Sequence, residues 1–324
     1  MSDVAAASGV SLVTVSRCIN HPDKVAPETL ALVRATVERL GYVPNLTAGS
    51  LASNRSRIVA AIVPTISNSV FSEMVEGLAS TLSAGGYQLL LGQSSYQPAD
   101  EERLVETFLG RRVDGLVLTG TPRTDHLAAR LRRNGLPVVQ TWDLPARPID
   151  MAVGFSNQET GAAAGRYLAG KGYRHIGFLG AQEDRAVQRL AGLQAALAAA
   201  GLPPPEAEML PPPVGIDRAG PGLAAMLERS PQLDAVFCNN DQLAGGVLFE
   251  CQRRGLRVPQ DLAVLGFGDL PIATAAFPAL STIRIGRRHM GEHAAHLLLA
   301  RLAGEPHLPA LTDIGYELVE RDSA

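Results

Sequence analysis

From Ile58 onward, short apolar runs alternate with amphipathic segments of helical length. The runs are "IVAAIVP", "QLLLGQS", "DGLVLTG" and "PVVQTWD", and segments such as "VFSEMVEGLASTLSAGGY" separate them. An uninterrupted apolar run of this length is typical of a strand buried on both faces. Strands that alternate with helices fold as a doubly wound parallel sheet. This pattern therefore predicts an α/β fold.

The same alternation then repeats. "HIGFLGA", "LDAVFCNN" and "LAVLGFG" are the apolar runs of the second set, and "AVQRLAGLQAALAAAG" and "LAGGVLFECQRRG" are helical segments between them. Residues 281–305 predict one more helix, and residues 309–321 predict a last strand. We expect two α/β units in tandem. Ligands of such sheets bind beyond the carboxyl ends of the strands, so the cleft between the units is the expected site.

Residues 8–20, "SGVSLVTVSRCIN", predict a different structure at the start of the chain. Two short helices are joined by a turn that contains Gly9, and Ser11 is placed to cap the second helix, which is the helix-turn-helix pattern. Val15 and Ile19 are four residues apart and are expected to face inward. The residues expected to face a partner are Leu12, Val13, Ser16 and Arg17. In this arrangement the second helix enters the DNA major groove.

A third helix is expected from Pro27 to Gly41, followed by "VPNLTAGSLASNRS", which has the composition of a linker and enough Leu and Ala for a short helix. We therefore expect a DNA-binding head (1–43), a hinge (44–57) and a core (58–324). Residues 1–57 contain six Lys or Arg and four Asp or Glu, within a chain of net charge −3. This modest asymmetry supports DNA binding only together with the helix pattern and with two heads acting jointly.

Composition excludes several classes of protein. Apolar residues make up 46% of the 324 residues and charged residues 19%, which is typical of a globular chain. No apolar run has the length of a membrane span, and the N-terminus lacks a signal-peptide pattern. The three cysteines are scattered and lack metal-ligand spacing, which favours buried thiols in a reducing cytoplasm. We expect a cytoplasmic protein with no membrane contact and no metal site.

The sequence argues against two rival classes, an enzyme and an exported sugar-binding protein. No G-x-S-x-G or H-E-x-x-H motif is present, the histidines are dispersed, and "GRYLAGKG" fails as a phosphate-binding loop because Gly172 stands where Ser or Thr is needed. We therefore expect no catalytic residue and no cofactor. An exported sugar-binding protein with the same core is the second rival. The missing signal peptide and the helical head argue against it.

"DVAAASGVSLVTVSRCIN", "ERLGYVPNLTAGSLASNRS" and "VFCNNDQLAGGVLFECQRRGLRVPQDLAVLGFGD" together resemble the LacI/GalR transcriptional repressors, over essentially the whole chain. "MAVGFSNQE" adds a likeness to the gluconate-utilisation repressors within that family. The resemblance implies operator DNA as a partner, a homodimer or dimer of dimers, and a periplasmic-binding-protein-like core. Its first subdomain would comprise about 58–154 and 286–306, and its second about 155–285 and 307–324.

The resemblance also assigns DNA-contacting residues. Leu12, Val13 and Arg17 match base-reading positions, and the Arg17 guanidinium can fork onto guanine. Thr14 and Ser16 suit phosphate contacts. In the hinge, the matching residues are Asn45 and Leu51, and Leu51 matches a leucine that wedges into the minor groove. Packing of Leu12 and Val13 inside the helical pair, and a solvated linker at Leu51, remain the alternatives.

The positions that match effector-binding residues are Phe71, Trp142, Asp143, Arg189, Asn240 and Asp269. Arg185, four residues before Arg189, is expected to assist it. Arg189 matches an arginine that binds sugar oxygens in relatives. Asn240 follows a predicted strand and is expected to present its amide to the ligand, while Asp241 is expected to cap the next helix. Trp142 suits either core packing or stacking on a sugar.

Two positions depart from the family pattern. Gly268 stands where many relatives carry an acid that binds sugar hydroxyls, so two arginines without that acid favour a sugar acid such as gluconate over a neutral sugar. Loop drift that moves Asp269 into the same place is the alternative. At the N-terminus only Met1 and Ser2 precede "DVA". Ser2 could cap a shortened first helix; otherwise the start lies upstream or the head binds DNA weakly.

Overall fold

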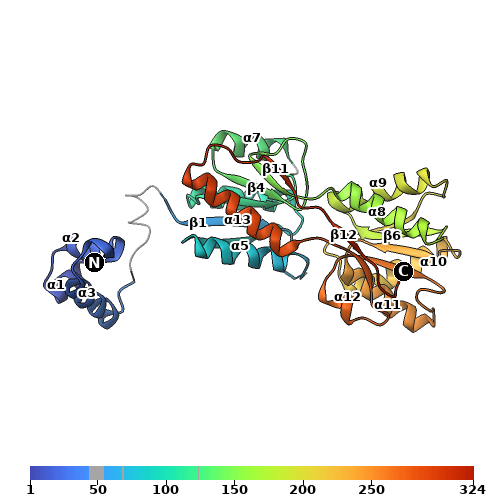
Figure 1. The fold of residues 1–324 in the computed structure, drawn as a ribbon, viewed down its shortest axis with the longest axis horizontal. Helices are drawn as coiled ribbons and strands as arrows, with labels where there is room; N and C mark the ends of the chain where they lie inside the picture. The colour runs from blue at the N-terminus through green and yellow to red at the C-terminus, as the bar shows by residue number, and fades with distance from the viewer. Residues whose placement is uncertain (44–54, 68, 123) are drawn as a thin grey trace. The chain divides into compact units, whose positions relative to one another are not determined.

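The computed structural model describes residues 1–43, 55–67, 69–122 and 124–324. The chain forms two compact units, Met1–Ser56 and Arg57–Ala324 (Figure 1). Asn45 and Leu51 lie outside the described residues, so the predicted hinge helix stays a prediction. Within the described ranges, no helix is long and apolar enough to cross a membrane.

The first unit contains a small three-helix head. Helix α1 spans Ser2–Ser8, α2 spans Leu12–Asn20, a 3-10 turn η1 covers Pro22–Lys24, and α3 spans Pro27–Leu40. Gly9 ends α1 with a left-handed φ of 67°, which reverses the chain before α2. The helices close around a small apolar core of Val4, Val15, Cys18 and Val33. The predicted helix-turn-helix is therefore present.

The first subdomain of the second unit is a six-stranded sheet in the order β11-β5-β4-β3-β1-β2. Its strands are β1 (Ile58–Val63), β2 (Gln88–Gln93), β3 (Gly115–Thr119), β4 (Val138–Thr141), β5 (Met151–Gly154) and β11 (Leu311–Asp313). All pairs are parallel. Its helices are α5 (Ser72–Ala84), α6 (Pro98–Gly110), α7 (Asp125–Asn134) and α13 (Arg287–Ala303), and η2 (Ser69–Phe71) leads into α5.

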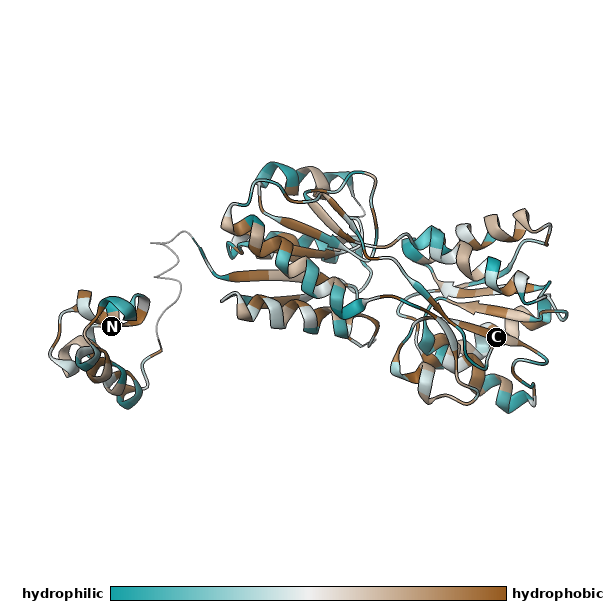
Figure 2. Cartoon of the chain, viewed as in Figure 1, coloured by the Kyte–Doolittle hydropathy of each residue, from teal (hydrophilic) through white to brown (hydrophobic). Residues whose placement is uncertain are grey.

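The second subdomain repeats the plan with the order β12-β10-β9-β8-β6-β7. Its strands are β6 (Ile176–Ala181), β7 (Glu206–Leu210), β8 (Ala235–Cys238), β9 (Ala263–Gly268), β10 (Ser281–Arg284) and β12 (Glu317–Val319). Only the β10–β12 pair is antiparallel within these described strands. Its helices are α8 (Asn157–Gly170), α9 (Asp184–Ala199), α10 (Ala219–Arg229), α11 (Asp241–Arg254) and α12 (Pro271–Ala275), with η3 at Ile216–Arg218. The predicted doubly wound fold is confirmed, and Figure 2 shows apolar strands inside each subdomain.

Three segments connect the subdomains, after β5, after β10 and between β11 and β12 (Figure 1). The prediction that 307–324 belongs wholly to the second subdomain is wrong. Strand β11 pairs with β5 in the first sheet, and the chain returns to the second sheet only at β12. The single last strand predicted for 309–321 is therefore two strands in two different sheets.

Several short elements were not predicted. Strands β5, β7 and β10 and helix α10 are absent from the sequence-based assignment, and β10 begins the segment that was expected to be entirely helical. These strands have four or five residues each. So short a run gives little periodicity, and pairing with neighbouring strands determines its conformation.

Helices α8 and α9 touch backbone to backbone, and this contact positions the first turns of α9. A Cβ atom on Gly161 would lie 1.9 Å from the carbonyl oxygen of Arg189, and one on Gly192 would lie 1.8 Å from that of Gln158. Only glycine permits this approach without a shift of one helix. The packing therefore fixes where Arg185 and Arg189, both on α9, present their side chains.

Candidate functional site: the head surface and the cleft of the core

Helix α2 divides into a buried and an exposed face. Val15 is fully buried and Ile19 packs partly buried against the head core, as predicted. Leu12 and Val13 are 50% and 61% exposed, so the alternative in which they pack inside the helical pair is wrong for this structure. Leu12 and Val13 are thus free to contact a partner, together with the exposed Arg17.

The start of α2 is held by the predicted cap. The Ser11 hydroxyl accepts a hydrogen bond from the Thr14 amide at 3.1 Å and lies 2.8 Å from the Thr14 hydroxyl. Arg17 is exposed one turn later on the helix. By contrast, Ser2 lies within α1, which begins after Met1 without a side-chain cap. The predicted capping role of Ser2 is therefore wrong.

A cleft of about 670 Å³ opens between the two subdomains of the core. It lies beyond the carboxyl ends of β1, β2, β3 and β4 and against the start of α9. Its polar and charged lining includes Tyr96, Glu101, Thr121, Asp143, Arg147, Glu183, Asp184, Arg185 and Gln188. The location agrees with the general rule for open α/β sheets.

The seven predicted effector residues separate in the structure. Asp143 and Arg185 line the cleft. Arg189 is buried one helical turn beyond Arg185 on α9. Phe71 and Trp142 belong to a buried aromatic group, and Asn240 and Asp269 are engaged in other contacts.

Arg185 and Arg189 share a carboxylate that the sequence analysis did not single out. Glu183 is buried and accepts a hydrogen bond from Arg185 Nη2 at 2.7 Å, while Arg189 Nη2 lies 3.7 Å from its other oxygen. We call Glu183, Arg185 and Arg189 the α9 cluster. All three side chains are less than 10% exposed. Glu183 could have been found from its place two residues after β6, beyond the carboxyl end of a predicted strand.

The single carboxylate of the α9 cluster does not balance the charges of its two buried guanidinium groups. Burial raises the pKa of Glu183, but the two guanidinium groups outweigh it and the pKa is lowered overall. Burial and the neighbouring Arg185 lower the pKa of Arg189 to about 10, with only partial compensation from Glu183. Arg189 Nε and Nη1 are buried without a hydrogen-bond partner, and the guanidinium lies 4.1 Å from the ring centre of Phe267. The site therefore holds unused donors next to an aromatic face.

The aromatic residues beside the cleft form a packed row. The ring centres of Phe71 and Trp142 are 5.0 Å apart with edge-to-face geometry, and Phe155 and Phe267 continue the row at 6.2 and 5.8 Å. Trp142 is 2% exposed and its indole nitrogen lies 3.0 Å from Met74 Sδ. Of the two roles left open for Trp142, the structure shows core packing.

The helix cap predicted for Asp241 is made by its neighbour Asn240. Asn240 caps α11, because its Oδ1 accepts from the Leu243 amide at 2.9 Å. Asp241 is fully buried and accepts from the Leu270 amide and the Thr282 hydroxyl, both at 2.6 Å. Burial raises the Asp241 pKa to about 6. The cap occupies Oδ1 and leaves the Asn240 Nδ2 group for other partners, so the role of Asn240 in effector binding stays a prediction.

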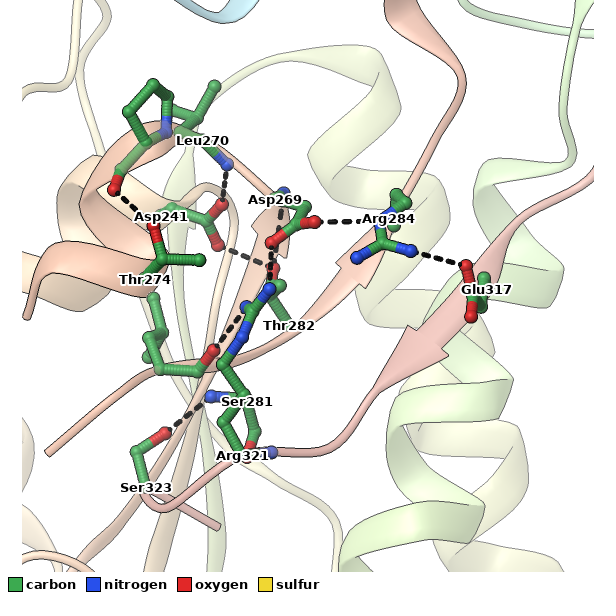
Figure 3. Close-up of polar contacts among 12 residues, drawn as sticks. Asp241, Asp269, Leu270, Thr274, Ser281, Thr282, Arg284, Glu317, Arg321 and Ser323 are labelled. Atoms are coloured by element: carbon green, nitrogen blue, oxygen red, sulfur yellow. Dashed lines mark hydrogen bonds and ion pairs between the residues drawn. The ribbon is translucent and has the colours of Figure 1, made fainter.

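Asp269 does not replace the missing acid at Gly268. Its carboxylate pairs with Arg284 at 2.7 Å and with Arg321 at 2.8 Å, and Arg284 also pairs with Glu317 at 2.8 Å. Figure 3 shows this group, which we call the Asp269 cluster, at the ends of β9, β10 and β12. Burial raises the pKa of Asp269, but the two guanidinium groups lower it overall. Loop drift into the cleft is therefore not what the structure shows.

A helix-turn-helix head joined to a two-subdomain core with a charged cleft defines a class: DNA-binding regulators controlled by a small ligand. Comparison with known proteins agrees. The family model for lacI-family bacterial regulatory proteins matches residues 1–45, and that for a periplasmic binding protein-like domain matches residues 166–324. The chain belongs to the LacI family.

Relatives cover the whole chain. The HTH-type transcriptional regulator GntR of Pseudomonas aeruginosa is 38% identical over 325 residues, which is 100% of this chain and 95% of that protein. A LacI-family regulator from Silicibacter pomeroyi matches with a TM-score of 0.92 at 32% identity, over 99% of this chain and 98% of the other. A lac repressor dimer bound to operator and an anti-inducer matches with a TM-score of 0.86 at 25% identity, over 99% and 97%. The protein is a DNA-binding transcriptional regulator, not an enzyme.

Proposed function

We propose that this protein represses transcription from a palindromic operator as a homodimer or dimer of dimers. In this proposal a sugar acid such as gluconate binds in the cleft and controls operator affinity. The likeness of the sequence to the gluconate-utilisation repressors and the GntR relatives support this effector class. The observation that carries the proposal is Arg189, whose two buried nitrogens have no acceptor.

The unused donors of Arg189 favour a ligand with a carboxylate. A guanidinium buried without acceptors is unfavourable, and a bound carboxylate would supply charge-assisted hydrogen bonds that a neutral sugar cannot. Asp143 and Gln188 lie on opposite walls of the cleft and are joined by a hydrogen bond of 3.2 Å. We propose that these two residues exchange that bond for ligand hydroxyls.

We propose that closure of the cleft on the ligand changes the affinity for operator DNA. The three connecting segments are the only described covalent links between the subdomains, so a ligand held by both walls favours one relative placement of them. Ligand binding changes operator affinity only if it distinguishes two such placements. We expect gluconate to lower operator affinity.

The head supplies the proposed sequence recognition. Leu12 and Val13 offer apolar contacts, for example to a thymine methyl, and Arg17 offers a forked contact to guanine. Thr14 and Ser16 are proposed to bind phosphate, and Asn45 and Leu51 to complete the contacts from the hinge. Arg17→Ala is expected to lose about 1–3 kcal/mol of operator binding and to relax one base position in each half-site.

Exposed apolar side chains on the second subdomain support self-association. Phe249 on α11 is 49% exposed, Ile216 on η3 is 39% exposed, and Phe277 after α12 is 98% exposed. Helix α11 packs against both α12 and η3. A second copy covering these side chains would give the two heads that an inverted-repeat operator requires.

Selection of bound DNA from a random pool, with and without gluconate, tests the regulator. We expect inverted repeats whose recovery falls when gluconate is present. Selected sites without inverted symmetry would contradict the dimeric repressor, and recovery unchanged by gluconate would contradict the effector.

A regulator that responds to a neutral sugar is the second candidate. Four carboxylates line the cleft, from Glu101, Asp143, Glu183 and Asp184, and carboxylates are good acceptors for sugar hydroxyls. Calorimetry with gluconate, glucose and galactose separates the two candidates. Tighter binding of glucose or galactose than of gluconate would favour the neutral sugar and rule out the sugar acid.

A further inference from the structure

The α9 cluster contains one carboxylate for two guanidinium groups, and the position of that carboxylate bears on ligand choice. Glu183 directly precedes α9, where an acidic side chain could cap the helix, but its side chain makes no capping hydrogen bond. It turns instead to Arg185 and Arg189. Its contacts therefore serve the arginines and not the helix end.

Glu183 lies closer to Arg185 than to Arg189. Arg185 makes a direct hydrogen bond of 2.7 Å to Glu183, whereas the nearest contact of Arg189 is 3.7 Å and leaves two of its nitrogens unpartnered. One guanidinium is thus neutralised within the protein. The other, buried one helical turn beyond the cleft lining, keeps unused donors. The cluster as a whole carries one positive charge in excess.

The opposite wall carries one charge of each sign, because Arg147 and Asp143 both line it. Asp143 faces α9, and its carboxylate accepts from the Leu144 amide at 2.9 Å and from Gln188 Nε2 at 3.2 Å. The wall therefore adds no net charge to the one surplus positive charge of the α9 cluster. A ligand group with two negative charges would exceed that surplus.

From these contacts we infer that Glu183 is a specificity-determining residue that selects a singly charged carboxylate over a doubly charged phosphate ester. The inference rests on the proposed function, because it concerns the effector of the same cleft. Replacing Glu183 by an uncharged residue frees Arg185 for the ligand. The cleft then presents two guanidinium groups, which suit a phosphate group.

The test is calorimetry at about pH 8, where a phosphate monoester carries close to two negative charges. The probes are gluconate and glucose 6-phosphate, which both have a six-carbon chain. We expect the unmodified protein to bind gluconate about 100-fold more tightly than glucose 6-phosphate. Equal affinities for the two would overturn the inference without the use of any variant.

Glu183→Gln is the decisive variant, and Glu228→Gln is its matched control. Both remove one negative charge by the same substitution, but Glu228 is exposed on α10 and does not line the cleft. We expect Glu183→Gln to reduce the preference for gluconate by about ten-fold or more, and Glu228→Gln to change it by no more than about two-fold. An unchanged preference in Glu183→Gln, or equal changes in both variants, would overturn the inference.

Arg185→Gln provides a second test if Glu183→Gln does not fold. It leaves Glu183 with Arg189 alone, so the surplus charge disappears and gluconate affinity should fall by about ten-fold. Unchanged gluconate affinity in this variant would overturn the inference. Failure of the unmodified protein to bind gluconate would overturn the proposed function instead. A gain in glucose 6-phosphate affinity confined to Glu183→Gln would still support the charge role of Glu183.

Discussion

The α9 cluster and the Asp269 cluster are both groups of arginine and acidic side chains in the second subdomain, but they are balanced differently. The Asp269 cluster pairs two arginines with two carboxylates, and each guanidinium lies within 2.8 Å of a carboxylate oxygen. The α9 cluster has a single carboxylate and leaves Arg189 with two unpartnered nitrogens. It is also the more deeply buried of the two. A balanced cluster stabilises the fold, whereas unused buried donors indicate a ligand site.

The largest expected effect is on ligand binding. Arg189→Ala removes the unpartnered donors and should weaken gluconate binding about 100-fold, roughly 3 kcal/mol, because charge-assisted hydrogen bonds are lost. Thermal stability should hardly change, since an incompletely paired buried charge leaves with the side chain. Calorimetry and a melting curve measure the two quantities. Normal gluconate affinity would show that the α9 cluster is structural, like the Asp269 cluster.

A second prediction concerns the contact between α8 and α9, which positions the arginines of the α9 cluster. Gly161→Ala places a Cβ against the Arg189 carbonyl, so α8 and α9 must move apart, at a cost of about 2 kcal/mol of stability. Gluconate affinity should fall as well, because α9 carries Arg185, which lines the cleft, and Arg189, the proposed partner of the ligand carboxylate. Gly170→Ala on the same helix is the control, since a Cβ there has no neighbour within 4 Å. Equal stability of the two variants in urea would mean that the helix contact is not restrictive.

A third prediction concerns the balanced cluster. Asp269→Asn removes the carboxylate shared by Arg284 and Arg321 and should lower stability by about 1–2 kcal/mol, with gluconate affinity unchanged. Asn tolerates the left-handed φ of 51° at this position, so backbone strain does not contribute to the measured loss of stability. Glu317→Gln, at a side chain 64% exposed, should cost less than about 0.5 kcal/mol. Loss of gluconate binding in Asp269→Asn would place this cluster in the ligand site.

The smallest expected effect is a pH dependence of stability that arises from Asp241, which is close to the Asp269 cluster. Burial raises the pKa of Asp241 from 3.8 to about 6, because its donors are neutral, whereas the guanidinium groups lower that of Asp269. The folded state therefore binds a proton at Asp241 more readily than the unfolded state. Between these two pKa values stability falls as pH rises, by about 1 kcal/mol from pH 5 to pH 6.

Denaturant titrations of the unmodified protein and of Asp241→Asn measure this slope. The variant should lose the decline between pH 5 and pH 6. The groups with lowered pKa, Glu183 and Asp269, act in the opposite direction and at lower pH, since their contribution is lost as pH falls through their folded pKa. A decline that persists in Asp241→Asn would assign the proton to another group.

Sequence patterns predicted the elements with strong periodicity. The alternation from Ile58 predicted two parallel sheets, and the Gly9–Ser11 turn predicted the helix-turn-helix, because such patterns depend on local conformation and on which residues are apolar. Strands β5, β7 and β10 were missed because they are short and are defined by their partners. The last predicted strand proved to be two because β11 and β12 join different sheets.

Local sequence patterns could not predict the partners of several polar residues. Asn240 and Asp241 are adjacent, and either side chain can cap a helix. Leu270 and Thr282, which are far along the chain, bring donors to Asp241 and leave the cap to Asn240. Likewise Asp269 was expected near the ligand, but Arg284 and Arg321 hold its carboxylate.

The sequence by itself determined the two-part architecture and the exposed face of α2, because these follow from periodicity and residue type. Its resemblance to the LacI/GalR repressors led to the prediction that Arg185 and Arg189 bind the effector. Only the tertiary structure decided how the charges combine. Glu183 lies close in sequence to both arginines, yet its pairing with them requires the turn after β6 and the close contact of α8 with α9. Charge balance in a buried site depends on distances of a few ångströms between side chains, and the packing of helices and strands sets those distances.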